Sequence, residues 1–592
     1  MKWEQIAEAK RILARETGTI FKDWGGKLAV ALIYPNTYYV GMSSLGLQTL
    51  YRLFNARHDV VCERVFYEPC QGWEPSQGFI ALESQRPLTD FGLLAFTLSY
   101  EMDYFHVVKM LQQTGIPPLA AQRDSSWPLV IAGGPAISAN PEPMAPFFDA
   151  IVIGEGEEII GPLVDACQET LGERETTLAA WAEIRGIYIP QTSNFKLQTP
   201  KLKGTDGSGF GVRGSGLRAE LRTPNWQPET WNLKPVERRW VRDLSRYPTH
   251  SVVLTPDTEF GDLYLIEIAR GCGRGCRFCL SGYLYRPPRE RPLEMLLEQA
   301  QEGLQHRQRI GLVSAAVSDY GRRDELASRL RAMGARISVS SLRADSLTET
   351  LVRALAESST QTLTIAPEVG CERLRQVISK TQSEQDLLQA VEWAAAYRFP
   401  QLKLYFMLGH PTETDEDMEA LLELVREAQG RFPRRLTINL TPFVPKPHTP
   451  FQWAAMTPGA TLQARQDYVK QRLRGSRINV KADSPAWAEV QGVLSRGDRR
   501  LAQALLKMDR LSLAGWRRAL KACGLTAEEF LRERRLDEPL PWQVVDSGVS
   551  TAFLRREWRL SREEKAGYAC PPGAEGCVAC GVCETTSVMR DA

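Results

Sequence analysis

The chain has 592 residues, of which 43% are hydrophobic, and this is enough for roughly three or four packed domains and too apolar for a disordered polymer. Lys and Arg number 73 against 71 Asp and Glu, and the net charge of +2 excludes a chain-wide attraction to polyanions. No run of about 18 apolar residues occurs, which excludes a membrane-spanning helix. With no secretory leader before the first helix, we expect a cytoplasmic protein whose twelve cysteines are kept as thiols for metal.

The amino-terminal third predicts an amphipathic helix over 1–22 and a doubly wound parallel sheet over 23–190. Apolar runs of strand length, such as Leu28 to Pro35, alternate there with helical patterns. Ligands of such sheets bind beyond the carboxyl ends of the strands. The residues predicted to bind a ligand at these ends are Ser99, Gly133, Gly134, Gly154 and Glu155. Alternatively, the glycines serve only to shape strand-to-helix turns.

The rest of the chain divides into four segments. Residues 191–255 are rich in Gly, Trp and Pro and predict a linker or excursion. Residues 256–456 contain six strand-and-helix units, which predict a partial or full parallel barrel with its active site at the carboxyl ends of the strands. Residues 457–569 predict a mainly helical extension, and 570–592 form a Cys-rich tail. The predicted fold class is therefore α/β, a doubly wound sheet plus a (β/α)6-type barrel, with a helical extension.

Three cysteines share one Gly-rich turn after the first barrel strand: Cys272, Cys276 and Cys279, spaced C-x-x-x-C-x-x-C. Thiolates this close in sequence can converge on one soft-metal centre. A four-iron cluster held by three cysteines keeps one iron open for a small molecule. Structural zinc is the alternative, although such sites usually take four protein ligands and no histidine stands nearby in sequence.

This triad, with the aromatic Phe278 before its last cysteine, resembles the signature of the radical SAM superfamily. Four later motifs are similar to strand-end motifs of the branch that carries an amino-terminal cobalamin-binding-like domain of Rossmann type. They are SSLRADSL (340–347), TIAPEVGCERLR (364–375), LKLYFMLGHPTETDED (402–417) and FVPKPHTPFQW (443–453). The segment GGPAISANPEPMAPFFDAIVIGEGEE (133–158) is similar to that branch as well.

The resemblance implies that the triad ligates a four-iron four-sulfur cluster whose open iron chelates S-adenosylmethionine (SAM). An electron from a flavodoxin- or ferredoxin-type donor then cleaves SAM to a 5′-deoxyadenosyl radical, and Phe278 lies against the cofactor. Positioning SAM needs a carboxylate and a guanidinium at strand ends, and we predict Glu368 and Arg343 for these roles. Alternatively, both residues form a structural ion pair at the barrel rim.

The sequence departs from the family pattern at two places. Many radical SAM enzymes end their second barrel strand in a Gly-Gly-Glu type motif, whereas this chain has SAAVSDYG (314–321), in which Ser318 and Asp319 are the candidate substitutes. The Asp-x-His-x-x-Gly motif of many cobalamin domains is absent, and His106 is interpreted as an ordinary helix residue. If cobalamin binds, we expect no histidine to ligate its lower face.

These features predict a cobalamin-associated radical SAM enzyme, with methyl transfer, a radical carbon-skeleton reaction or modification of RNA or the ribosome as the candidate activities. Two alternatives stay open. One is a radical SAM enzyme without cobalamin, and the other is a non-catalytic iron–sulfur protein that binds RNA or the ribosome.

A basic segment, Arg465 to Lys521, carries 14 Lys and Arg against 5 Asp and Glu. Positive charge on helices suits a phosphate backbone, so an RNA or ribosomal partner is a hypothesis for this segment. The alternative is an ordinary solvated helical face.

The tail contains four cysteines with the spacing C-x6-C-x-x-C-x-x-C: Cys570, Cys577, Cys580 and Cys583. Four thiolates in one short loop predict a structural zinc or a second four-iron cluster, and the close spacing is similar to ferredoxin ligation. The remaining alternative is a frayed terminus with idle thiols.

Overall fold

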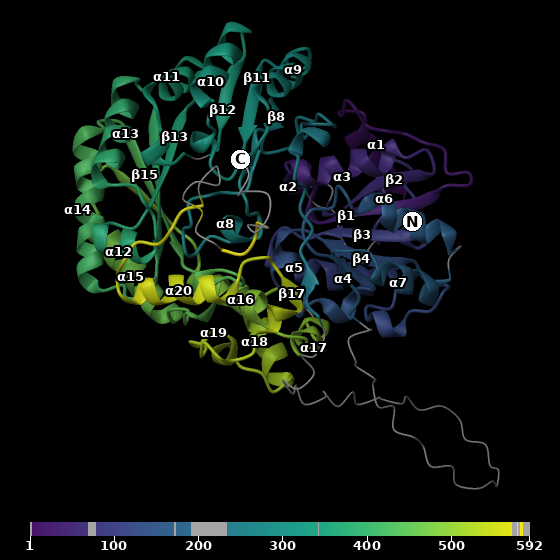
Figure 1. Ribbon diagram of the computed structural model, residues 1–592. Helices are drawn as coiled ribbons and strands as arrows, with labels where there is room; N and C mark the ends of the chain where they lie inside the picture. Colours follow the sequence, from purple (N-terminus) through teal and green to yellow (C-terminus); the bar gives the residue numbers. More distant parts are fainter. Residues whose placement is uncertain are drawn as a thin grey trace, which may run out of the picture.

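Two α/β units lie side by side, and a helical carboxyl-terminal part packs against both of them (Figure 1). The computed structural model describes the following residues: 3–68, 78–170, 173–190, 234–340, 342–508, 510–570, 577 and 580–583. Of the predicted linker, 191–233 lies outside the described residues. Among the described residues, no helix has the length and apolar character needed to cross a membrane.

The first unit is a six-stranded sheet with the order β2-β1-β3-β4-β5-β6, in which the first five strands run parallel and β6 runs antiparallel. Its strands are β1 (Leu28–Thr37), β2 (Val60–Glu68), β3 (Leu93–Thr97), β4 (Leu129–Gly133), β5 (Ala150–Val152) and β6 (Ile187–Tyr188). Both faces of β1 are buried, which explains its continuous apolar run. The chain adds β2 on one side of β1 and then β3 on the other side, and such a switch point in strand order is where open α/β sheets bind ligands.

Helices cover both faces of this sheet. Val30 and Leu32 pack toward α3 (Leu45–Ala56), α6 (Ile160–Glu169) and α7 (Arg174–Ala182), and Ala31 and Ile33 pack toward α4 (Tyr104–Thr114). The shorter helices are α1 (Trp3–Leu13), α2 (Tyr38–Met42) and α5 (Pro135–Ala139). The predicted doubly wound sheet is therefore confirmed.

The second unit is a partial barrel of parallel strands. They are β8 (Leu263–Glu267), β11 (Arg309–Val313), β12 (Arg336–Val339), β13 (Thr362–Glu368), β14 (Gln401–Leu408), β15 (Arg435–Pro442) and β16 (Ile478–Ala482). A parallel bridge between Leu342 and Ile365 joins the group β12-β11-β8 to the group β13-β14-β15-β16. The six predicted strands are present, and β16 is a seventh strand in a segment that we expected to be mainly helical.

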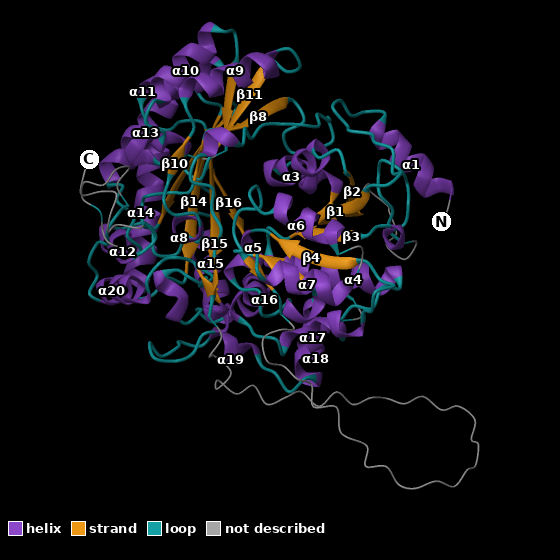
Figure 2. Ribbon diagram, turned by 45° about the vertical axis from the view of Figure 1, so that its right-hand side comes forward, coloured by secondary structure: helices purple, strands orange, loops and turns teal. Residues whose placement is uncertain are grey.

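Helices lie on the outer side of these strands (Figure 2). They are α9 (Leu293–Leu304), α10 (Arg323–Ala332), α11 (Glu349–Glu357), α13 (Glu384–Ala396), α14 (Asp415–Arg431) and α15 (Gly459–Arg472). Along β14, buried residues alternate with half-buried ones such as Lys403 and Tyr405. Because the buried set contributes to the core, the half-buried set faces the barrel interior, which is only partly filled.

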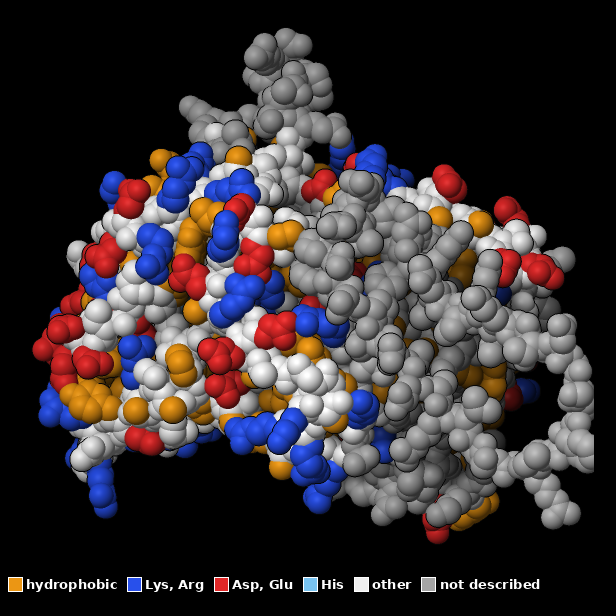
Figure 3. Space-filling model, turned by 90° about the horizontal axis from the view of Figure 1, so that it is seen from below, with side chains coloured by type: hydrophobic (Ala, Val, Ile, Leu, Met, Phe, Trp, Pro, Cys, Tyr) orange, Lys and Arg blue, Asp and Glu red, His pale blue; other side chains and the backbone are white. Residues whose placement is uncertain are grey.

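The carboxyl-terminal part contains α16 (Pro485–Arg496), α17 (Leu501–Leu506), α18 (Leu513–Ala522), α19 (Ala527–Leu531) and α20 (Thr551–Arg562). Four basic side chains of the basic segment are not exposed, namely Arg465, Arg496, Arg499 and Arg500. Arg496 is fully buried and donates to the carbonyl of Ala454 at 2.7 Å, while Arg499 binds Glu142 of the first unit at 2.7 Å. Figure 3 shows Lys and Arg interspersed with Asp and Glu on the face seen from below.

Candidate active site

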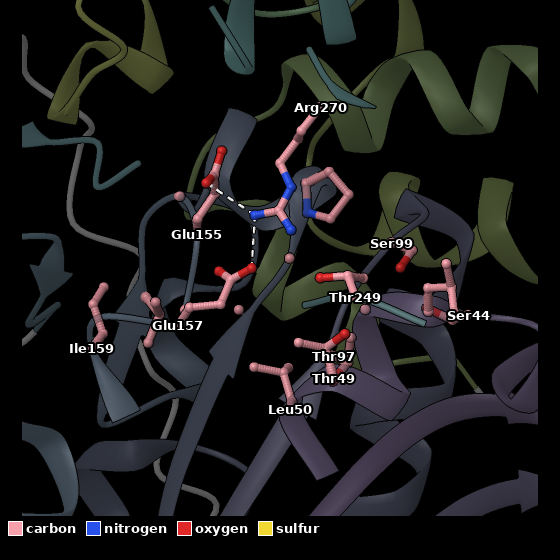
Figure 4. A pocket seen from close by; sticks show the side chains of 18 of the residues that line it. Ser44, Thr49, Leu50, Thr97, Ser99, Glu155, Glu157, Ile159, Thr249 and Arg270 are labelled. Carbon is pink, nitrogen blue, oxygen red and sulfur yellow. Dashed lines mark hydrogen bonds and ion pairs between the residues drawn. The ribbon is translucent and has the colours of Figure 1, made fainter. Parts of the chain in front are cut away.

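A cavity of about 460 Å³ lies where the carboxyl ends of the first sheet face those of the barrel (Figure 4). This volume is typical of small-molecule and cofactor sites. Apolar side chains from α3 and α6, among them Leu50 and Leu163, line it together with Ile159 just before α6. No histidine is among its described lining residues. All five predicted loop residues line it: Ser99, Gly133, Gly134, Gly154 and Glu155.

The glycines of this cavity fall into two classes. Gly134 and Gly154 have φ of +116° and +103°, and an added Cβ would lie 2.5 Å from the Leu98 carbonyl oxygen and 2.1 Å from that of Arg239. Backbone geometry alone requires glycine at these two positions. A Cβ on Gly133 would come no closer than 3.5 Å to Val152, and one on Gly46 no closer than 3.6 Å to Ser44. Gly133 and Gly46 therefore keep space open for a ligand.

Glu155 connects the first unit to the barrel. Its carboxylate accepts hydrogen bonds from Arg289 at 2.7 and 3.0 Å, from Arg270 at 3.0 Å and from the backbone N–H of Val241 at 2.9 Å. Burial acts to raise the pKa of Glu155, but the two guanidinium groups outweigh it and hold that pKa below its ordinary value. The Glu155 carboxylate thus lines the cavity, and its hydrogen bonds are made to groups of the protein itself (Figure 4).

The cysteine loop begins at the wall of this cavity, since Arg270 and Gly271 line it and Cys272 follows. Cys276 is buried, and Cys272 and Cys279 are half-buried. Burial first, and then the charges of the two other thiols, raise the pKa of Cys279 to about 12, so the three thiols are close enough to act on one another. No described group of three or more His, Cys, Asp or Glu side chains is arranged to hold a single metal ion.

Arg343 lies beside the cysteine triad. Its Nη1 is 3.7 Å from the Sγ of Cys276, and Asp345 holds the same guanidinium at 3.1 and 2.9 Å. Ser318 is fully buried, and its hydroxyl accepts from the backbone N–H of Arg343 at 3.2 Å. Asp319 binds Arg274 of the cysteine loop at 2.8 and 2.6 Å. The structure thus gathers three predicted SAM-binding residues around the loop, with protein partners already in place.

Glu368 lies at the end of β13, in a left-handed backbone conformation with φ of +68°. It forms an ion pair with Lys380 at 2.7 Å rather than with Arg343. A strained non-glycine residue at a strand end is characteristic of functional sites. Its role in SAM binding stays a prediction.

His410 is a site residue that the sequence interpretation did not single out. It follows β14, is 3% exposed, and its ring lies 5.9 Å from that of Phe278 and 5.0 Å from that of Phe443. Neither ring nitrogen has a hydrogen-bond partner among the described residues. Burial, and next the charge of Lys380, lower the pKa of His410 to about 3, so the ring is neutral. The motif containing His410 was visible in the sequence, but its lack of a partner was not.

The first tail cysteine, Cys570, contacts the cysteine loop. The backbone N–H of Cys570 donates to the carbonyl of Gly273 at 2.5 Å. Cys580 is buried, Cys583 is half-buried and Cys577 is exposed. Residues 571–576, 578–579 and 584–592 lie outside the described residues.

Comparison with known proteins gives matches in both units. Residues 46–190 match the family described as radical SAM proteins, N-terminal, and residues 266–425 match the radical SAM superfamily. An uncharacterized protein of Methanocaldococcus jannaschii is 30% identical over 482 residues, which cover 80% of this chain and 90% of that protein. The ribosomal protein uS12 methylthiotransferase RimO of Thermotoga maritima is 28% identical over 178 residues, 28% of this chain and 41% of that protein.

Among solved structures, the radical S-adenosylmethionine methyltransferase TsrM of Kitasatospora setae, with cobalamin and a [4Fe-4S] cluster bound, is similar with a TM-score of 0.48 and 13% identity. The match covers 91% of this chain and 99% of that chain. Family assignment does not depend on this weaker likeness, because the two family matches lie in the sequence itself. The chain belongs to the radical SAM superfamily of enzymes.

Proposed function

We propose that this chain is a cobalamin-associated radical SAM methyltransferase. The observation that carries the proposal is that one cavity joins the carboxyl ends of both sheets. Gly133 lines it from the first unit, and Gly271 and Ser314 line it from the barrel. Because Gly271 directly precedes Cys272, a ligand in this cavity lies beside the cysteine loop.

The residues present suit the groups that this function needs. The thiols of Cys272, Cys276 and Cys279 would hold a four-iron cluster, and the cavity at Gly133 and Gly46 would hold part of a cobalamin. When bound, the cluster supplies an electron for SAM cleavage and cobalamin supplies a methyl carrier. The absence of histidine from the described cavity lining supports a cobalamin whose lower face is not bound by histidine.

The chain's own residues prepare the cysteine loop for this role. Arg343 directs its guanidinium at the Sγ of Cys276, with Nη1 3.7 Å away. Asp345 fixes the position of Arg343, and the ion pair of Asp319 with Arg274 fixes the loop. His410 offers two unpartnered nitrogens in the barrel beside Phe278, where a bound ligand can use them.

A second candidate function is modification of RNA or a ribosomal protein. It is favoured by exposed basic side chains of the carboxyl-terminal part, namely Lys470, Arg472, Arg474, Arg477, Lys481, Lys507, Arg510, Arg517, Arg518 and Lys521. RimO, which is 28% identical to this chain over 178 residues, is by its name a methylthiotransferase of a ribosomal protein. RNA affinity through these side chains should fall steeply with salt.

The test is anaerobic reconstitution of the full chain with iron, sulfide and hydroxocobalamin, followed by gel filtration and absorbance of the bound fraction. We expect about one cobalamin per chain, and transfer of labelled methyl from SAM to an RNA or protein fraction. SAM cleavage without bound cobalamin would identify a radical SAM enzyme that does not use it. If the chain neither cleaves SAM nor transfers methyl, the result would favour the non-catalytic alternative.

A further inference from the structure

The segment before the tail cysteines runs antiparallel along the cysteine loop. Arg277 donates to the carbonyl of Lys565 at 2.9 Å, and the N–H of Cys570 donates to the carbonyl of Gly273 at 2.5 Å. Between these contacts, a Cβ on Gly275 would lie only 2.5 Å from the carbonyl oxygen of Tyr568. The backbone that leads into the tail is therefore in direct contact with the loop that carries the first three cysteines.

The later tail cysteines are held by the start of α20. The N–H of Ser550 donates to the carbonyl of Cys580 at 2.7 Å. Gly581 has φ of +102°, and a Cβ there would lie 2.9 Å from the Gly548 carbonyl oxygen, so this close approach requires glycine. Cys580 is 5% exposed and packs in a cluster with Tyr283 and Phe553. The tail is thus fixed to the protein at both ends of its cysteine set.

A buried positive charge lies beside the cysteine loop, since a Cβ on Gly275 would lie 3.6 Å from Nη2 of Arg286. Arg286 is fully buried, with its guanidinium carbon 4.8 Å from the ring centre of Tyr283 and 5.2 Å from that of Phe553. Its Nε donates to the carbonyl of Gly282 at 2.6 Å, but Nη1 and Nη2 have no acceptor among the described residues. Burying a guanidinium with two unsatisfied nitrogens costs desolvation free energy unless an anion accepts hydrogen bonds from it.

The tail lies beside the rings on which Arg286 packs. Tyr283 and Phe553, which face its guanidinium, belong to the same buried cluster as Cys580. The backbone of Cys570 is bound to Gly273 of the cysteine loop, and that of Cys580 to Ser550 at the start of α20. Four thiolates around a metal centre are anionic and would satisfy Arg286.

We propose that Cys570, Cys577, Cys580 and Cys583 hold a second four-iron four-sulfur cluster, packed against the loop of the first triad and met by the buried charge of Arg286. Four cysteines leave this cluster no open iron, so it binds no SAM. Arg286 stabilises the more negative, reduced form of the cluster and so raises its reduction potential. The inference goes beyond the proposed reaction and does not depend on it.

The test removes the first triad and measures metal at the tail. The full chain with Cys272→Ala, Cys276→Ala and Cys279→Ala is reconstituted anaerobically with iron and sulfide and then assayed for iron, sulfide and zinc. We expect about four irons and four sulfides per chain. A chain that keeps one zinc and no iron, or no metal at all, would overturn the proposal, whatever the outcome for SAM cleavage.

Further substitutions in the same background assign the remaining iron. Adding Cys577→Ser and Cys583→Ser should remove it, and neither side chain is buried, so the fold should tolerate the change. Adding Cys523→Ser, a cysteine outside both sets, should leave the iron in place. Iron that survives the loss of Cys577 and Cys583 would contradict the assignment.

Arg286→Met should lower the reduction potential measured by EPR-monitored titration, and an unchanged potential would contradict the role of Arg286.

Discussion

Glu155 of the first α/β unit is bound by Arg289 of the barrel unit, with Oε1 2.7 Å from Nη2 and both side chains buried. Arg289 lies in β10 (Arg289–Glu290), which pairs with β9 (Ala269–Arg270), the strand that leads into the cysteine loop. Arg270 of that strand binds the same carboxylate. One carboxylate therefore connects the cavity of the first unit to the start of the cysteine loop.

Glu155→Gln should destabilise the protein strongly, because two buried guanidinium groups lose their shared anion. Removing one partner of a buried ion pair typically costs about 3–5 kcal/mol. The measurement is Tm by calorimetry, compared with Asp262→Asn, which breaks an exposed ion pair with Arg309 and should cost at most about 1 kcal/mol. Equal shifts in the two variants would show that the interface does not depend on Glu155.

The same pair predicts a pH dependence. The pKa of Glu155 is lowered in the folded protein, so its contribution to stability is present above the ordinary carboxyl pKa and is lost as pH falls through the folded value. Glu155→Gln lacks this contribution at every pH. The difference in Tm between the wild type and the variant should therefore be constant from pH 8 to 6 and shrink below about pH 4. A difference that grows on acidification would contradict the pair's role.

Gly133→Leu should abolish cobalamin binding while leaving the cluster intact. The new side chain points into the cavity, where an added Cβ meets only Val152 at 3.5 Å, so the fold should tolerate it. Retained cobalamin is measured by absorbance after gel filtration, and iron is measured in parallel. Gly430→Leu, on the exposed surface of α14, is the matched control and should change neither. Normal cobalamin binding by Gly133→Leu would place the ligand elsewhere.

His410→Leu should separate stability from activity. Replacing a buried ring whose nitrogens have no partner removes an uncompensated desolvation cost, so Tm should stay the same or rise. If the ring contacts a bound ligand, the rate of 5′-deoxyadenosine formation from SAM should fall about tenfold or more. His306→Leu, at an exposed position, should affect neither. A fall in Tm together with unchanged turnover would assign His410 to packing alone.

Much of the fold could be predicted because its strands are short and buried on both faces. The run from Leu28 to Pro35 contains one apolar residue after another, and the observed β1 covers it. Strands that the sequence interpretation did not identify, such as β6 and β16, carry weaker signals. β6 has two residues, and β16, INVKA, has one buried residue and obtains its backbone hydrogen bonds from β15.

Side-chain pairing in the candidate site could not be predicted in the same way. Arg343, predicted from the sequence to bind SAM, lies beside the cysteine triad, but the sequence did not reveal Asp345 as the carboxylate that binds this guanidinium. Likewise, Glu368 pairs with Lys380, twelve residues further along the chain. Such pairs depend on backbone direction at strand ends, which a left-handed residue like Glu368 changes locally.

The measurement that tests the central claim most directly is formation of 5′-deoxyadenosine from SAM by the reduced, iron-loaded full chain. The wild type should form it, and Cys276→Ala should form none, because the loss of one of three thiolate ligands removes the cluster that SAM requires. Cys523→Ala should match the wild type. Undiminished 5′-deoxyadenosine formation by Cys276→Ala, or none by the iron-loaded wild type, would contradict the assignment of this loop as the active site.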